Sequence, residues 1–95
     1  GNVVLLGRNS DDVDHEMLVL RLPQGATTEI LLQSPGPLLP EGVDFIGQMT
    51  VPAGGPAVLP LMNLPSGNYV VVDMLLDETG TPNMAQGYRA RLVVQ

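Results

Sequence analysis

Apolar and polar residues alternate along several short stretches of the chain, and this period of two predicts β-strands. The clearest stretch covers residues 15–22, where Glu16 and three leucines share one face and His15 begins the other. We predict strands over residues 2–8, 15–22, 45–51, 57–64, 69–76 and from Tyr88 or Arg89 to Val94, with a short helix over 27–32.

Prolines and glycines separate these stretches and predict turns between short strands. Polar turns are expected at residues 9–14 and 77–82, and a proline-rich loop at 34–44. Pro60 lies inside a predicted strand and cannot donate a ladder hydrogen bond, so that strand belongs at an edge or a bulge. The pattern as a whole predicts an all-β fold, a sandwich or a barrel.

The segment Pro65-Ser66-Gly67-Asn68-Tyr69 places a turn directly before a tyrosine that starts a strand. This order is typical of a tyrosine corner, in which the phenol hydroxyl donates to backbone a few residues upstream. Tyrosine corners occur in Greek-key sandwiches, and the segment therefore favours a sandwich over a barrel.

Composition limits the classes of function. The 95 residues suffice for one domain, placed at 1–95, and no apolar run reaches the roughly 18 residues that span a membrane. The net charge of −6, with four arginines and no lysine, argues against a nucleic-acid partner or an anionic membrane. The absence of cysteine excludes disulfides and thiolate chemistry.

Two parts of the chain, residues 9–22 and 64–94, resemble bacterial secreted cupredoxins of the plastocyanin and azurin kind. In that family a polar turn precedes a copper-binding histidine, and a tyrosine corner leads along a strand to a copper-binding cysteine. A second histidine and a methionine follow in the next loop. The resemblance implies a Greek-key β-sandwich, with residues 23–57 as its variable crossover region.

The resemblance also assigns the four positions of the family's metal site. His15 falls at the first histidine, Asp73 at the cysteine, Asn83 at the second histidine and Tyr88 at the methionine. A blue-copper site needs two imidazoles, a thiolate and a weak thioether, and only His15 keeps its ligand type. We therefore expect no metal, no cofactor and a vestigial site at these positions.

Asp73 shares its predicted strand face with Tyr69, Val71 and Leu75, and we expect this face to point inward. A buried carboxylate needs a partner, so we expect Asp73 to bond to His15, Asn83 or nearby backbone amides. A lone His–Asp pair has no nucleophile, and Ser10 and Ser66 lie in turns without an elbow motif. We therefore predict that the protein is not an enzyme.

Other features receive structural interpretations. The five methionines are scattered, which favours core filling over a thioether site for copper. The acidic turn with Asp11, Asp12 and Asp14 lacks the glycine and terminal glutamate of an EF-hand and is interpreted as solvated. The lack of tryptophan argues against a carbohydrate-binding sandwich.

The chain opens directly on a strand-like run, and we interpret it as a piece of a longer secreted protein. The family carries one or two strands before this point, so the fold lacks its first strands and leaves a sheet edge open. Either upstream residues cover this edge or a second copy does, as a homodimer or by strand exchange.

The function expected from the sequence is a copper-free structural or partner-binding module of the bacterial cell envelope, extracellular or periplasmic, with an unidentified protein partner. The alternative is a metal-handling protein that binds copper or zinc through His15 and Asp73.

Overall fold

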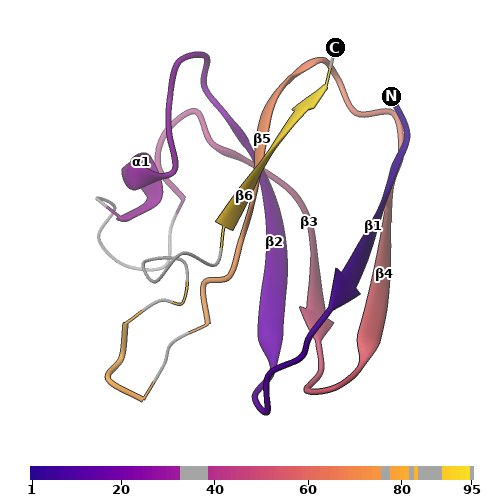
Figure 1. The fold of residues 1–95 in the computed structure, drawn as a ribbon. Coiled ribbons are helices and arrows are strands. Elements are labelled where there is room, and N and C mark those ends of the chain that lie inside the picture. The colour runs from indigo at the N-terminus through magenta and orange to yellow at the C-terminus, as the bar shows by residue number, and fades with distance from the viewer. Residues whose placement is uncertain (33–38, 76–77, 82, 84–88, 95) are drawn as a thin grey trace.

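Within the residues that the structure describes, the fold has six strands and one short helix (Figure 1). It was obtained as a computed structural model, which describes residues 1–32, 39–75, 78–81, 83 and 89–94. The elements are β1 (Val3–Arg8), β2 (His15–Leu22), α1 (Glu29–Leu32), β3 (Asp44–Val51), β4 (Pro56–Leu61), β5 (Gly67–Val72) and β6 (Arg89–Val94).

The strands form two antiparallel sheets, which confirms the all-β prediction. One sheet has two strands in the order β1–β4, and the other has four in the order β3–β2–β5–β6. Within the described residues β1 pairs only with β4, and β4, which contains Pro60, pairs only with β1. The expectation that Pro60 lies in an edge strand is therefore confirmed.

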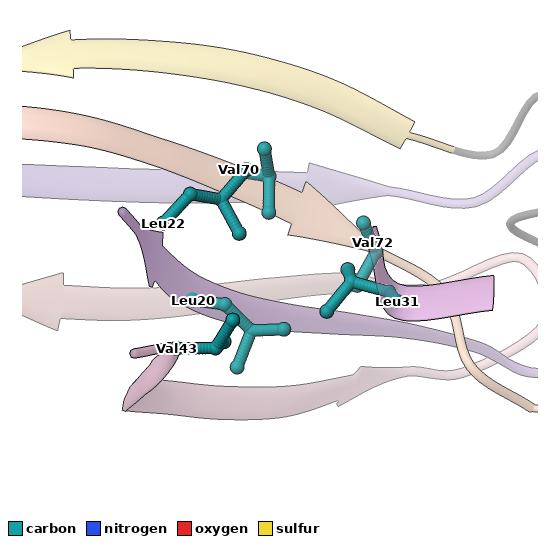
Figure 2. Packing of buried hydrophobic residues seen from close by; sticks show 6 residues of the cluster. All are labelled: Leu20, Leu22, Leu31, Val43, Val70 and Val72. Atoms are coloured by element: carbon teal, nitrogen blue, oxygen red, sulfur yellow. The ribbon is translucent and has the colours of Figure 1, made fainter. Parts of the chain in front are cut away.

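Apolar side chains cover both faces of the four-stranded sheet at β2 and β5. On one face Val19 and Tyr69 pack against Leu61 and Leu64, which joins this sheet to the two-stranded one. The opposite face carries a second cluster with α1, formed by Leu20, Leu22, Leu31, Val43, Val70 and Val72 (Figure 2). Because residues 19 and 20, and likewise 69 and 70, point to opposite faces, β2 and β5 are buried on both sides.

The tyrosine corner is confirmed. The Tyr69 hydroxyl donates to the Pro65 carbonyl oxygen at 2.5 Å, and its ring is almost fully buried. Gly67 enters β5 with φ of 155° and lies against the Arg21 guanidinium, whose Nε is 2.8 Å from where a Cβ would stand. The turn that precedes the tyrosine therefore needs glycine.

Several predicted boundaries were wrong. β5 ends at Val72 instead of residue 76, because the Asp73 side chain accepts the Leu75 N–H and forms an Asx turn. β4 ends at Leu61 instead of residue 64, where the chain turns through Asn63 with φ of 57°. The helix covers only residues 29–32, and most of the predicted loop over 34–44 lies outside the described residues.

One methionine contradicts the expectation of core filling. Met62 is 62% exposed, whereas Met74 packs against the cluster beside α1. Met84 lies outside the described residues. In the part of the chain that the structure describes, no helix has the length and apolar character to cross a membrane.

Candidate functional site

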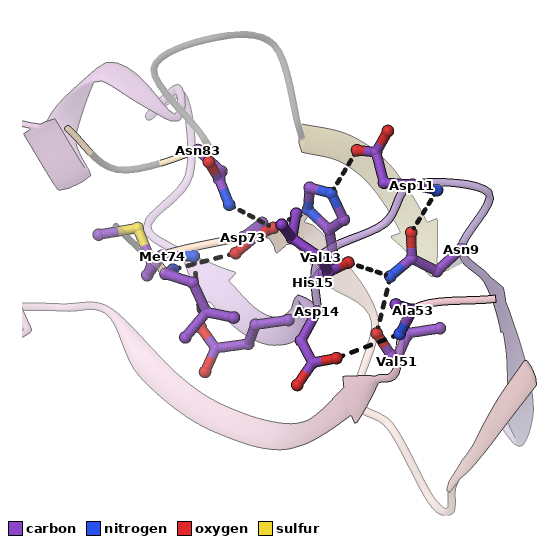
Figure 3. A network of polar contacts seen from close by, with 12 residues as sticks. Asn9, Asp11, Val13, Asp14, His15, Val51, Ala53, Asp73, Met74 and Asn83 are labelled. Atoms are coloured by element: carbon purple, nitrogen blue, oxygen red, sulfur yellow. Dashed lines mark hydrogen bonds and ion pairs between the residues drawn. The ribbon is translucent and has the colours of Figure 1, made fainter. Parts of the chain in front are cut away.

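Three of the four positions assigned to the vestigial metal site lie together at one end of the molecule (Figure 3). His15 begins β2, Asp73 directly follows β5, and Asn83 belongs to the connection between β5 and β6. The fourth, Tyr88, lies outside the described residues. Hydrogen bonds join the three described residues although 68 positions separate the first from the last.

Asp73 is the centre of this cluster and is only 3% exposed. Its Oδ2 accepts hydrogen bonds from His15 Nδ1 and, at 3.0 Å, from Asn83 Nδ2. Its Oδ1 accepts the Leu75 N–H at 3.0 Å. The expectation of an inward, fully partnered carboxylate is therefore confirmed, whereas Leu75, predicted to share its face, lies beyond the strand and is 36% exposed.

His15 lies between two carboxylates. Its Nδ1 contacts Asp73 and its Nε2 contacts Asp11 Oδ2 at 2.7 Å. A neutral imidazole has one N–H, so donation to both carboxylates requires the imidazolium. Burial works against protonation, but the hydrogen bonds to Asp73 and Asp11 outweigh it and raise the pKa of His15 above its ordinary value.

The two carboxylates hold His15 unequally. The Asp73 side chain is 4% exposed and the Asp11 side chain is 48% exposed. Water screens the Asp11 contact more strongly, so most of the stabilisation comes from Asp73. If His15 loses one proton, we expect it to keep its bond to the buried Asp73 and release Asp11.

Glu16 lies next to this cluster and is partly buried beside it. Burial raises the pKa of Glu16; the hydrogen bond from the Met74 N–H opposes this rise, and the nearby charge of Asp73 adds to it. Its Oε1 accepts that N–H at 3.3 Å and its Oε2 accepts Gln48 Nε2 at 3.2 Å. Glu16 therefore connects β2 to β3 and to the residues that follow β5.

Asn9 is a buried residue of this region that the sequence reasoning did not single out. Its Nδ2 donates to the carbonyl oxygens of Val13 at 2.7 Å and Val51 at 3.0 Å, and its Oδ1 accepts the Asp11 N–H at 2.9 Å. The signal was present, because an asparagine at the start of a polar turn is typical of an Asx turn.

The acidic turn is more ordered than predicted. Asp14 Oδ1 accepts the Ala53 N–H at 3.1 Å, and Asp11 contacts His15. All three carboxylates are exposed, as expected for a solvated turn, and two of them also accept hydrogen bonds. Asn9, Asp11 and Asp14 together fix this turn against β3 and against His15.

A cleft of about 420 Å³ opens beside the cluster. Its lining includes Arg8, Asp11, His15, Glu16 and Asp73. The cleft combines three carboxylates with two basic side chains at the end of the molecule where β1 meets β2. The side chains of Met17, Val51, Val71 and Val72 also line it, so it presents charged groups beside an apolar wall.

A metal ion would have to compete with the existing contacts of His15. Both ring nitrogens face carboxylates, so a metal must displace Asp73 or Asp11 and remove a proton. Among the described residues, no group of three or more histidine, cysteine, aspartate or glutamate side chains has an arrangement that would hold a metal ion. The cluster is therefore an ion-paired network whose donors and acceptors satisfy one another.

In comparisons with known protein families, curated proteins and solved structures, none matches this chain. The interpretation of the site therefore depends on its own geometry and chemistry.

Proposed function

We propose that this chain is a copper-free, cupredoxin-like module with a structural or partner-binding role. Its metal site is replaced by a hydrogen-bonded cluster of His15, Asp73 and Asn83. The observation that carries the proposal is the meeting of these three residues. The resemblance to cupredoxins assigned them to one site, and they lie in hydrogen-bonded contact.

The chemistry of the cluster is that of a tie between chain segments. An imidazolium between two carboxylates satisfies the buried charge of Asp73 without a metal ion. Asn83 adds a second donor to Asp73, and its N–H donates to the Leu75 carbonyl oxygen at 2.9 Å. The cluster holds β2 to the end of β5 and closes the loop that follows.

The proposed location and partner follow from the resemblance and the cleft. The resemblance to secreted bacterial proteins favours the cell envelope, extracellular or periplasmic. The cleft beside His15 gives that end of the molecule a concave surface, apolar with charged groups beside it, for a protein partner. We propose this end as the face that binds.

Metal handling is the second candidate function, because an imidazole in contact with a carboxylate is also a common part of zinc and copper sites. Titration with Cu(I), Cu(II) and Zn(II) separates the two proposals. The wild type and His15→Ala are compared, since His15 is the only histidine.

The first proposal predicts no stoichiometric binding at micromolar metal in either protein. It also predicts that His15→Ala is less stable than the wild type. Stoichiometric micromolar or tighter binding that is lost in His15→Ala would support metal handling and exclude the copper-free module.

A further inference from the structure

The outer face of the two-stranded sheet carries an exposed apolar surface. Val4 and Leu6 on β1 are 67% and 55% exposed, and Val58 on β4 and Met62 just beyond it are 60% and 62% exposed. We call these four residues the outer patch. The strand register places Leu6 opposite Val58 and Val4 opposite Pro60, so these side chains share one face.

The inner face of the same sheet is already used. Val3 and Leu5 on β1, and Leu59 and Leu61 on β4, pack into the cluster that joins the two sheets. Residues of β1 and β4 therefore alternate between a buried apolar face and an exposed apolar face. In a strand with one solvent-exposed face, apolar residues normally alternate with polar ones. In β1 and β4 the exposed positions are mostly apolar as well.

The two strands of the small sheet carry almost no charged residues. The chain has ten acidic residues and a net charge of −6, yet β1 and β4 contain no carboxylate. Arg8, at the end of β1, is the only charged residue in either strand. The outer face of this sheet is therefore the surface where a second acidic molecule meets the least electrostatic repulsion.

We infer that the outer patch docks against the outer patch of a second copy of this chain, forming a homodimer with its two small sheets face to face. One sheet face can pack on another, and two copies of one patch related by a two-fold axis form a closed pair. A partner with basic character would instead be drawn to the acidic surfaces elsewhere on the chain.

The size of the patch sets the strength of the dimer. Four large side chains that are more than half exposed present on the order of 400 Å² of apolar surface. Two copies then bury on the order of 800 Å² in total, below the roughly 1,000 Å² of a stable interface, so the contact is a weak and transient one. The dimer therefore forms in the micromolar to millimolar range and dissociates on dilution.

Sedimentation equilibrium across that range tests the inference, with the wild type, Leu6→Lys and Val58→Lys. Each substitution places an ammonium group in the interface, while the lower net negative charge reduces the long-range repulsion between copies. Val13→Lys is the matched control, because Val13 lies in the turn between β1 and β2 with the same 55% exposure as Leu6. Circular dichroism checks that every variant is folded.

The inference predicts a wild-type dimer that both patch variants weaken at least about tenfold and that Val13→Lys leaves unchanged. It also predicts tighter association at higher salt, since salt screens the repulsion and strengthens apolar contact. A wild type that stays monomeric up to millimolar concentration would overturn it. So would a dimer that folded Leu6→Lys and Val58→Lys leave intact, or one that salt dissociates.

Discussion

Replacing Asp73 by asparagine changes the centre of the polar cluster with little change of shape. The carboxylate accepts from His15, Asn83 and the Leu75 N–H and is almost completely buried. In Asp73→Asn, one oxygen still accepts the Leu75 N–H, but the other becomes an NH₂ group. That group faces the N–H donors of His15 and Asn83, so both residues lose the oxygen that accepted their hydrogen bonds and meet a donor in its place.

The size of the effect follows from these contacts. A hydrogen bond to a charged group contributes about 1.5–3 kcal/mol, and a buried donor left without an acceptor costs about 1–3 kcal/mol. His15 keeps its contact to Asp11 and can lose its proton, which limits the loss. We expect Asp73→Asn to lower the free energy of unfolding by about 3 kcal/mol, a large share of the roughly 5–15 kcal/mol typical of a domain.

Urea unfolding measures this change. The assay is run at about pH 6, where His15 is protonated because its pKa lies above the ordinary value near 6.5. With a slope of about 1–3 kcal/mol per molar urea, the midpoint should fall by about 1–3 M.

Asp12→Asn is the matched control for the charge change, because Asp12 lies exposed in the neighbouring turn. It should stay within about 0.5 kcal/mol of the wild type. If Asp73→Asn is as mild as Asp12→Asn, the cluster does not hold the fold together and the reasoning fails.

Three further predictions concern other parts of the same structure. Because folding raises the pKa of His15, the stability that its protonation adds to the fold is complete below about pH 6.5 and is lost as the pH rises through the pKa of the folded state. The difference in unfolding free energy between the wild type and His15→Gln should therefore shrink over that rise, and a growing difference would show the opposite linkage. Tyr69→Phe removes the hydroxyl that donates to Pro65 and should cost about 1–2 kcal/mol in thermal unfolding, whereas an unchanged melting temperature would mean that the corner adds nothing. Gly7→Ala places a Cβ 2.7 Å from Val51 Cγ2 and should cost about 1–3 kcal/mol in urea unfolding, whereas an unchanged midpoint would mean that the neighbouring side chains move aside without cost.

The sequence predicted best the features that short-range patterns encode. The strand over residues 15–22 matches β2 at both ends, because alternation continues until Pro23 stops it. The tyrosine corner was predictable because its two partners, Pro65 and Tyr69, lie only four positions apart around one turn. The inward position of Asp73 followed from its parity with Tyr69, even though the strand ends one residue before Asp73.

Features that depend on contacts between distant segments were missed. The pairing of His15 with Asp11 depends on the conformation of the turn between them, and Asn9 fixes that turn by reaching Val51 on β3. Met62 was expected in the core, but apolar patterning does not tell which face of a two-stranded sheet is covered. The resemblance to cupredoxins remains a proposal, since it was drawn from motifs and none of the comparisons matches the chain.

The protonation of His15 in solution tests the central claim most directly. Nitrogen-15 NMR of the two ring nitrogens, recorded through a pH titration with and without one equivalent of Zn(II), reports both the proton and any metal. We predict that both nitrogens are protonated at pH 6, that the pKa of His15 falls in Asp73→Asn, and that zinc leaves the spectrum unchanged. A neutral ring at pH 6, or a nitrogen signal that zinc shifts stoichiometrically, would contradict an ion-paired tie at this site.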